Sequence, residues 1–179
     1  IHSTGNIQSC AGENLNFSIP MTVGQNIVKW YINGSIVDFE NDSLLSINTD
    51  GYPSGSYDVW ATIQNTNGCI YATAPVSFTV YPAPVTPGIW ANSNSICANS
   101  TLRIYSNGAA NTTYQWYRND ILIQNATFNY YEASQAGSYS LKTTNANGCS
   151  SYSNTIALFN SSAEPIGPIE IVADKSIIC

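Results

Sequence analysis

Five cysteines are the residues of this sequence with the clearest chemical potential. None of them forms a Cys-x-x-Cys pair, the spacing typical of zinc sites and thiol redox centres. Well-separated cysteines in a chain this poor in charge instead indicate disulfides and an oxidising, extracellular environment. Because the number is odd, one thiol stays free or bonds outside the sequence, and we expect a piece of a longer chain. The cysteines are Cys10, Cys69, Cys97, Cys149 and Cys179.

Groups that perform catalysis are scarce. The one histidine is His2, which removes most histidine-based catalysis and most zinc sites. Serine, threonine and tyrosine are abundant, but no histidine or activating lysine arrangement accompanies them. The sequence has no glycine-rich phosphate loop and no marked pair of carboxylates for hydrolysis. It therefore predicts no catalytic residue, no cofactor and no enzyme.

Composition excludes further classes of function. Charged residues make up 9% of the chain, and the net charge is −6. Five Lys and Arg residues are too few for the basic surface that binds nucleic acid or anionic lipid. No apolar run approaches the roughly 18 residues of a membrane span, so we expect no membrane insertion by this segment. With 44% apolar residues, the chain can bury a core.

Short strands are the elements that must position these side chains. Leu15, Phe17 and Ile19 alternate with polar residues, as half-buried antiparallel strands do. Asn-Gly at 67–68 and at 147–148 predicts tight hairpins. The same period of two recurs in segments 28–32, 57–63, 76–80, 102–104, 114–116, 139–141 and 156–158.

An internal repeat organises the strands. Four motifs occur twice in the same order, and residues 169–179 begin a third copy. The motif pairs are 10–17 with 97–104, 28–34 with 114–120, 55–57 with 137–139, and 65–69 with 145–149. We predict domains at 1–81 and 82–162, with the first strand of a third repeat at 163–179. Proline-rich joints at 81–88 and 163–168 favour extended chain. The predicted fold is all-β, with tandem β-sandwiches in an extended rod.

The order of these motifs resembles an immunoglobulin-like domain. Trp30-Tyr31 and Trp116-Tyr117 match strand C, and a Gly-x-Tyr motif followed by a hairpin matches strands F and G. The usual inter-sheet cysteines are absent, and cysteines instead precede strand B and follow the Asn-Gly turn. In this respect the chain resembles the tandem immunoglobulin-like repeats of Bacteroidota cell-surface proteins, which include adhesins, gliding-motility filaments and type IX secretion cargo. The resemblance implies a stalk, with some repeats that recognise sugars or surfaces.

Two disulfide patterns remain open. In a sandwich of this topology the turn between strands A and B lies at one pole and the F–G hairpin at the other, too far apart for a bond. We therefore favour a bond from Cys10 to Cys149 across the repeats, with Cys69, Cys97 and Cys179 bonding to neighbouring repeats. The alternative is Cys10 with Cys69 and Cys97 with Cys149, which needs only two cysteines per repeat.

A few other residues are candidates for surface roles. Trp60 is expected to point outward and Trp90 follows the joint, so each could pack against a neighbouring domain or contact a sugar ring. The resemblance implies O-glycosylation of Ser43, because 42–44 is similar to the Bacteroidota acceptor. The acidic run 38–42 offers oxygen ligands for calcium, but its spacing is not that of an EF-hand. We expect solvated charge there and no metal.

The sequence thus favours a structural and interaction module, the stalk of an extracellular bacterial adhesin or filament. Expected partners are neighbouring repeats and other surface proteins or glycans. The alternative is a pair of carbohydrate-binding accessory domains of a secreted enzyme. A glycan array with Trp60→Ala and Trp90→Ala variants separates the two.

Overall fold

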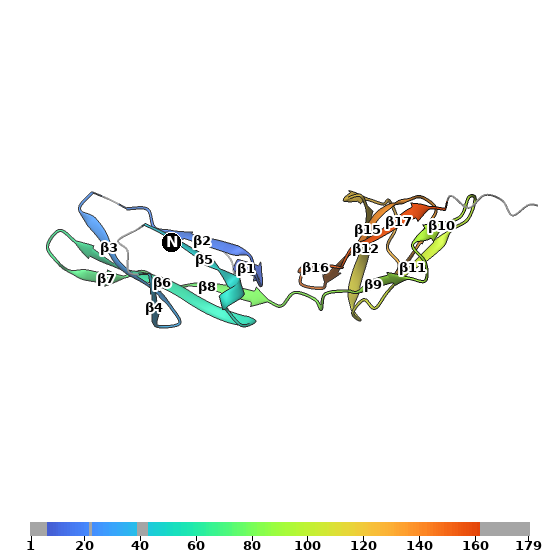
Figure 1. Cartoon of the computed structure of the whole chain (residues 1–179). Coiled ribbons are helices and arrows are strands. Elements are labelled where there is room, and N and C mark those ends of the chain that lie inside the picture. Colours follow the sequence, from blue (N-terminus) through green and yellow to red (C-terminus); the bar gives the residue numbers. More distant parts are fainter. Residues whose placement is uncertain (1–6, 22, 39–42, 162–179) are drawn as a thin grey trace, which may run out of the picture. The chain divides into compact units, whose positions relative to one another are not determined.

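The structure is a computed structural model that describes residues 7–21, 23–38 and 43–161 (Figure 1). Apart from one 3-10 turn, η1 (Thr49–Gly51), its regular elements are strands. The first copy contains β1 (Ile7–Cys10), β2 (Asn14–Ser18), β3 (Gln25–Ile32), β4 (Ser35–Asp38), β5 (Leu44–Asn48), β6 (Gly55–Asn65), β7 (Ile70–Ala72) and β8 (Val76–Tyr81). The second contains β9 (Ile89–Ala91), β10 (Ser95–Ile96), β11 (Leu102–Ser106), β12 (Thr112–Arg118), β13 (Ile121–Leu122), β14 (Tyr130–Ala133), β15 (Gly137–Asn145), β16 (Ser150–Tyr152) and β17 (Ile156–Asn160).

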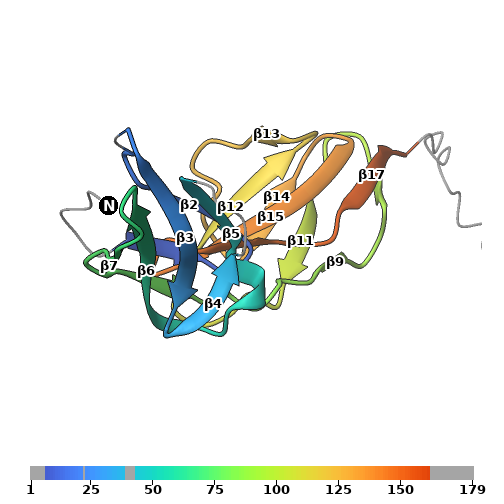
Figure 2. The ribbon, with the colours of Figure 1, turned by 90° about the vertical axis from the view of Figure 1, so that its left-hand side faces the viewer.

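The strands β1–β8 form the first sandwich. One sheet has the order β1-β8-β6-β3-β4, with β7 also paired to β6, and the other is the pair β2-β5. Figure 2 shows β3 and β4 of this larger sheet beside each other from a second direction. Trp30 is fully buried between the sheets, where Phe17, Val59 and Phe78 join it. Alternation along each strand sends these residues inward and the polar ones outward.

The strands β9–β17 form the second sandwich with the same plan. Its larger sheet has the order β10-β17-β15-β12-β13, with β16 paired to β15, and its smaller sheet is β14-β11-β9. Trp116, Ile104, Leu141 and Leu158 fill its core. The all-β, immunoglobulin-like sandwich predicted from the sequence is confirmed, because the alternating segments became paired strands with their apolar side chains inside.

Both sandwiches carry a tyrosine corner, a recurrent feature of immunoglobulin-like domains. The Tyr57 hydroxyl donates to the backbone oxygen of Pro53 at 2.6 Å, and the Tyr139 hydroxyl donates to that of Gln135 at 2.7 Å. Each tyrosine lies two residues before a fully buried residue, Val59 or Leu141. Burial raises the pKa of Tyr139, and neighbouring tyrosine adds to the effect. The two corners fix the entry into β6 and β15.

Two consecutive short strands pair with the same long strand in each sandwich, β7 and β8 with β6, and β16 and β17 with β15. A hydroxyl side chain lies at the break between the two short strands, a feature that the sequence pattern does not reveal. In the first, Thr73 Oγ1 accepts from the Ala61 amide at 3.1 Å while the Thr73 amide donates to the Ala61 oxygen. In the second, Ser153 makes the same two contacts with Leu141. The hydroxyl takes the place of a backbone carbonyl, so the strand shifts without leaving the neighbouring amide unpaired.

Contacts divide the chain into two compact units. Unit 1 comprises Ile1–Val85 with Ala109–Thr113 and Thr143–Ser151, and unit 2 comprises Thr86–Gly108, Tyr114–Lys142 and Tyr152–Cys179. By its contacts, the hairpin between β15 and β16 therefore belongs to unit 1. The predicted third-repeat strand, 163–179, lies outside the described residues.

Among the described residues, no helix has the length and apolar character that crossing a membrane requires.

Candidate functional site

A disulfide within unit 1 joins residues of the two sequence copies. Cys10, the last residue of β1, is bonded to Cys149, and their Cα atoms are 5.5 Å apart. Cys149 is only 1% exposed. This is the pair named by the first of the two disulfide hypotheses. The alternative, with Cys10 bonded to Cys69 and Cys97 to Cys149, is wrong for this structure, because Cys69 and Cys97 are exposed and free.

Hydrogen bonds around the disulfide hold the start of the proline-rich joint. The Asn145 side-chain amide donates to the Pro82 oxygen at 3.0 Å, and the Ser151 hydroxyl donates to the Pro84 oxygen at 2.6 Å. The Cys149 sulfur lies 3.9 Å from the Tyr81 oxygen. All of these residues belong to unit 1. The joint thus has side-chain partners for two backbone carbonyls in addition to the stiffness of proline.

The hairpin that carries Cys149 is built by its first asparagine. Asn145 Oδ1 accepts from the amides of Asn147 and Cys149, both at 3.0 Å. The Asn145 amide donates to the Cys149 oxygen, and the Gly148 amide donates to the Asn145 oxygen. Gly148 has φ 83°, which explains the glycine of the predicted Asn-Gly turn. Asn147 does not take a positive φ, so glycine alone supplies it.

The second candidate site is an aromatic row on the outer face of the sheet β14-β11-β9. Tyr105 on β11 lies directly opposite Trp90 on β9 and Tyr130 on β14, so the three side chains share one face. The Trp90 and Tyr105 ring centroids are 5.9 Å apart, and Phe128 extends the row at 5.8 Å from Tyr130. Trp90 is 47% exposed and Phe128 65%. The aromatic row therefore offers ring surfaces to solvent.

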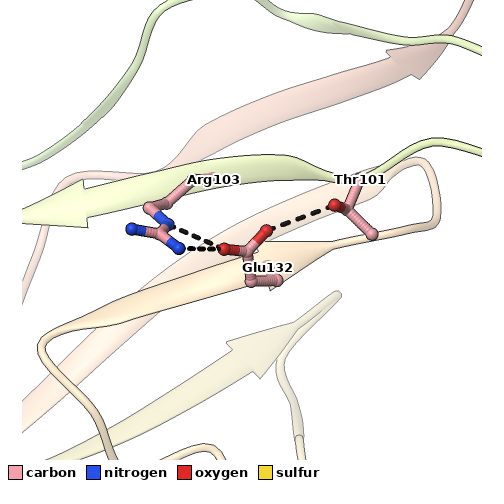
Figure 3. Close-up of polar contacts among 3 residues, drawn as sticks. All are labelled: Thr101, Arg103 and Glu132. Atoms are coloured by element: carbon pink, nitrogen blue, oxygen red, sulfur yellow. Dashed lines mark hydrogen bonds and ion pairs between the residues drawn. The ribbon is translucent and has the colours of Figure 1, made fainter.

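A charged pair, Arg103 and Glu132, borders the aromatic row, and Figure 3 shows this pair with Thr101. Arg103 Nε donates to Glu132 Oε1 at 2.7 Å, and the Thr101 hydroxyl donates to the other carboxylate oxygen at 3.2 Å. The Arg103 guanidinium also lies 4.4 Å from the centre of the Tyr130 ring. The hydrogen bond from Arg103 lowers the pKa of Glu132, and the same bond raises the pKa of Arg103. Both groups stay charged and exposed beside the rings.

Trp60, the other tryptophan singled out from the sequence, lies in the first sandwich. It is half-buried and stacks on Tyr31 of the neighbouring strand, with 5.5 Å between ring centroids. Sequence reasoning found Trp90 and Trp60 singly but missed Tyr105, Tyr130 and Phe128. The signal was the pairing register of three strands, which alternation within one strand does not give.

The remaining candidates contribute no site in the described residues. Ser43 is exposed in a bend, and its backbone oxygen accepts from the Ile19 amide. Glu40 and Asp42 of the acidic run lie outside the described residues, as does Cys179. Among the residues that the structure describes, no group of three His, Cys, Asp or Glu side chains is placed to hold a metal ion.

A half-open cleft of about 350 Å³ lies in the second sandwich between the turn after β12 and the approach to β15. Arg118, Gln124, Gln135 and Tyr139 are among its lining residues. The Tyr139 hydroxyl is already bonded to the Gln135 backbone, so the cleft holds no available nucleophile or acid–base pair among these groups. We assign it no chemistry.

No protein-family model matches this sequence, and neither does any curated protein. Among solved structures, murine CEACAM1b is similar at 15% identity and TM-score 0.40, covering 86% of this chain and 96% of its own. The fibronectin(III)-like modules of Clostridium thermocellum CbhA are similar at 12% identity and TM-score 0.41, covering 92% and 95%. Bacteroides ovatus SGBP-B, solved in complex with a mixed-linkage heptasaccharide, is similar at 15% identity and TM-score 0.36, covering 88% and 43%. These neighbours are immunoglobulin-like or fibronectin III-like domains.

Proposed function

We propose that this chain is a non-catalytic structural and interaction module from the stalk of an extracellular bacterial surface protein. Its tandem sandwiches serve as spacers, and its partners are neighbouring repeats of the same kind. The observation that carries this proposal is the Cys10–Cys149 disulfide, which ties residues 139 positions apart and comes from both sequence copies.

The mechanism of such a stalk is resistance to bending. Short linkers between small domains normally permit relative motion, because the interfaces they create are small and polar. Here the hairpin of the second copy is joined to the first copy by the disulfide. Its side chains also donate hydrogen bonds to two carbonyl oxygens of the joint, those of Pro82 and Pro84. A covalent bond plus these hydrogen bonds supports a stiff joint. Disulfides are typical of extracellular proteins, in keeping with the proposed location.

Bending of the joint tests the proposal. Two fluorophores, one in each sandwich, report the spread of distances in the wild-type chain and in Cys10→Ser with Cys149→Ser. We expect a wider distribution in the double variant. The matched control is Cys69→Ser with Cys97→Ser, which removes two free thiols and should leave the distribution unchanged. Equal distributions in wild type and the Cys10/Cys149 variant would contradict the stalk mechanism.

A second candidate function is carbohydrate binding, and the aromatic row favours it. Exposed aromatic rings contact the apolar faces of sugar rings, while neighbouring charged groups bond to hydroxyls. Trp90, Tyr105 and Tyr130 with Arg103 and Glu132 combine both kinds of group on one face. A glycan array of the whole chain tests this function, with Trp90→Ala as the loss variant and Trp60→Ala as the control on the other sandwich. Binding that survives Trp90→Ala would exclude the aromatic row.

A further inference from the structure

The two free cysteines occupy the same positions in their repeats as the two bonded ones. Cys69 matches Cys149, because each follows Asn-x-Asn-Gly in its hairpin. Cys97 matches Cys10, because each begins the turn that precedes β11 or β2. Resting on the proposed function, we propose that Cys69 and Cys97 are the two halves of further disulfides of the same kind. Each bonds to the unlike cysteine of another module of this type, so that two copies of this chain join through Cys69 and Cys97.

The hairpin that carries Cys69 already has the geometry of the bonded one. Asn65 Oδ1 accepts from the amides of Asn67 at 3.0 Å and Cys69 at 2.9 Å, and the Asn65 amide donates to the Cys69 oxygen at 2.9 Å. The corresponding three distances in the Cys149 hairpin are 3.0, 3.0 and 2.9 Å. Gly68 has φ 80° against 83° for Gly148. This hairpin therefore needs no rearrangement to take the role that the Cys149 hairpin has.

The turn that carries Cys97 likewise matches the bonded turn. The Cys97 oxygen accepts from the Ser100 amide at 3.1 Å, as the Cys10 oxygen does from the Glu13 amide at 3.1 Å. In both repeats the strand before the turn runs parallel to the last strand of its sandwich, β1 beside β8 and β10 beside β17. The turn at Cys97 thus shares this hydrogen bond and the parallel strand with the turn at Cys10, although Cys97 directly follows β10 whereas Cys10 is the last residue of β1.

Burial distinguishes the bonded Cys149 from the two free cysteines. Cys149 is 1% exposed in its disulfide, whereas Cys69 and Cys97 are both exposed. Exposed thiols react readily with a disulfide oxidant once deprotonated. The existing disulfide joins a cysteine of a turn, Cys10, to a cysteine of a hairpin, Cys149. A bond between Cys97 and Cys69 follows the same pattern, whereas a bond between two like cysteines does not. A contact between unlike surfaces extends into an open chain of modules wherever its rotation does not close a ring.

The bond forms by thiol–disulfide exchange with a small disulfide oxidant such as oxidised glutathione. The thiolate of Cys69 attacks glutathione disulfide and releases one glutathione, which leaves a mixed disulfide on Cys69. The thiolate of Cys97 in a second copy attacks the Cys69 sulfur and releases the other glutathione. Two protein thiols lose two electrons and two protons in all, and one glutathione disulfide becomes two glutathione thiols.

The test uses the whole chain with Cys179→Ser, so that only Cys69 and Cys97 carry free thiols besides the existing disulfide. The chain is equilibrated in a buffer of reduced and oxidised glutathione, and peptide mapping without reduction counts the three kinds of cross-link in the dimer fraction. Random pairing gives mixed and like cross-links in equal numbers. We expect Cys69–Cys97 to exceed both like pairs together by about tenfold, the factor that roughly 1.4 kcal/mol supplies.

A matched control moves the thiol within the same hairpin. In Cys69→Ser with Asn67→Cys, the thiol stays exposed at the hairpin but shifts by two residues, so the mixed excess should disappear. Equal numbers of mixed and like cross-links in the parent chain, or monomers bearing only glutathione, would overturn the inference. Failure of the stalk mechanism shows itself elsewhere, as an unchanged distance distribution when Cys10–Cys149 is removed, and the two outcomes are independent.

Discussion

The outer faces of the two smaller sheets differ although the sheets have equivalent places in their sandwiches. On β2 and β5 most of the outward side chains are amides and hydroxyls, with Leu44 also exposed at one end of β5. Two pairs bond across the strands: Ser46 donates to Asn16 at 2.6 Å, and Asn48 donates to Asn14 at 3.0 Å. On β11 and β14 the outward positions instead hold the Arg103–Glu132 pair and the rings of Tyr105 and Tyr130, and β9 adds Trp90 as a third strand that the two-stranded sheet β2-β5 lacks.

The cores beneath these faces agree closely. Each centres on a fully buried tryptophan, Trp30 or Trp116, and each has a tyrosine corner. Side-chain alternation explains the contrast, since one side of a strand is fixed by packing while the other side is free to vary. The same kind of core therefore supports two outer faces of different chemistry.

The largest expected effect concerns the shared core. Trp30→Ala and Trp116→Ala should each lower the free energy of unfolding of their sandwich by about 3–5 kcal/mol, because both leave a large cavity. Denaturant unfolding followed by NMR signals of each sandwich measures the two losses. Losses that differ by more than about 2 kcal/mol would break the equivalence of the two cores.

Removal of the disulfide comes next. Cys10→Ser with Cys149→Ser should reduce stability by about 2–5 kcal/mol, since the cross-link restricts the unfolded chain. Calorimetry under oxidising conditions measures the change against wild type. The variant Cys69→Ser with Cys97→Ser should unfold like wild type, and a similar loss in that variant would show that the effect is not that of the disulfide.

The tyrosine corners sharpen the comparison at smaller scale. Tyr57→Phe and Tyr139→Phe each remove one hydrogen bond and should cost about 0.5–1.5 kcal/mol. We expect the greater loss for Tyr139, which is 1% exposed, because its hydrogen bond is partly buried whereas that of Tyr57 is exposed. Chemical denaturation of the two variants side by side measures the order, and a greater loss for Tyr57→Phe would reverse it.

Alkaline pH probes the same corner. The pKa of Tyr139 is raised by burial, so the folded state retains this proton more strongly than the unfolded state. Its contribution is complete below the ordinary tyrosine pKa of about 10 and is lost as the pH rises through the higher folded value. Unfolding at stepped pH should show this loss in wild type and a weaker loss in Tyr139→Phe. Equal slopes would contradict the assignment.

The smallest effect belongs to the exposed ion pair of the second sandwich. The pKa of Glu132 is lowered by its bond from Arg103, so the pair is intact above the ordinary glutamate pKa and is lost as the pH falls through the lower folded value. An NMR titration of the Glu132 carboxyl should give a midpoint below the ordinary value of about 4.3. Arg103→Gln should move the midpoint back toward that ordinary value. An unchanged midpoint in this variant would show that Arg103 does not lower the pKa of Glu132.

The sequence predicted the strands, the repeat and the hairpins, because each depends on nearby residues. Alternation placed Trp30 and Trp116 in the core, and Asn-Gly located the turns before Cys69 and Cys149. Features that depend on register were missed. Tyr105 meets Trp90 and Tyr130 only after three strands have paired, and the split at Thr73 and Ser153 requires a hydroxyl aimed at a particular amide.

Short strands at the edges of a sheet have a consequence for a chain that carries two similar sandwiches. The strands β13 and β10 that border the larger sheet of the second sandwich contain two residues each. Linked copies keep their strands at high local concentration while they emerge and fold, and a long free edge would invite a strand from the wrong copy. An edge of two residues offers few backbone partners for such an exchange. Tandem copies with edges this brief can fold beside one another and keep their strands to themselves.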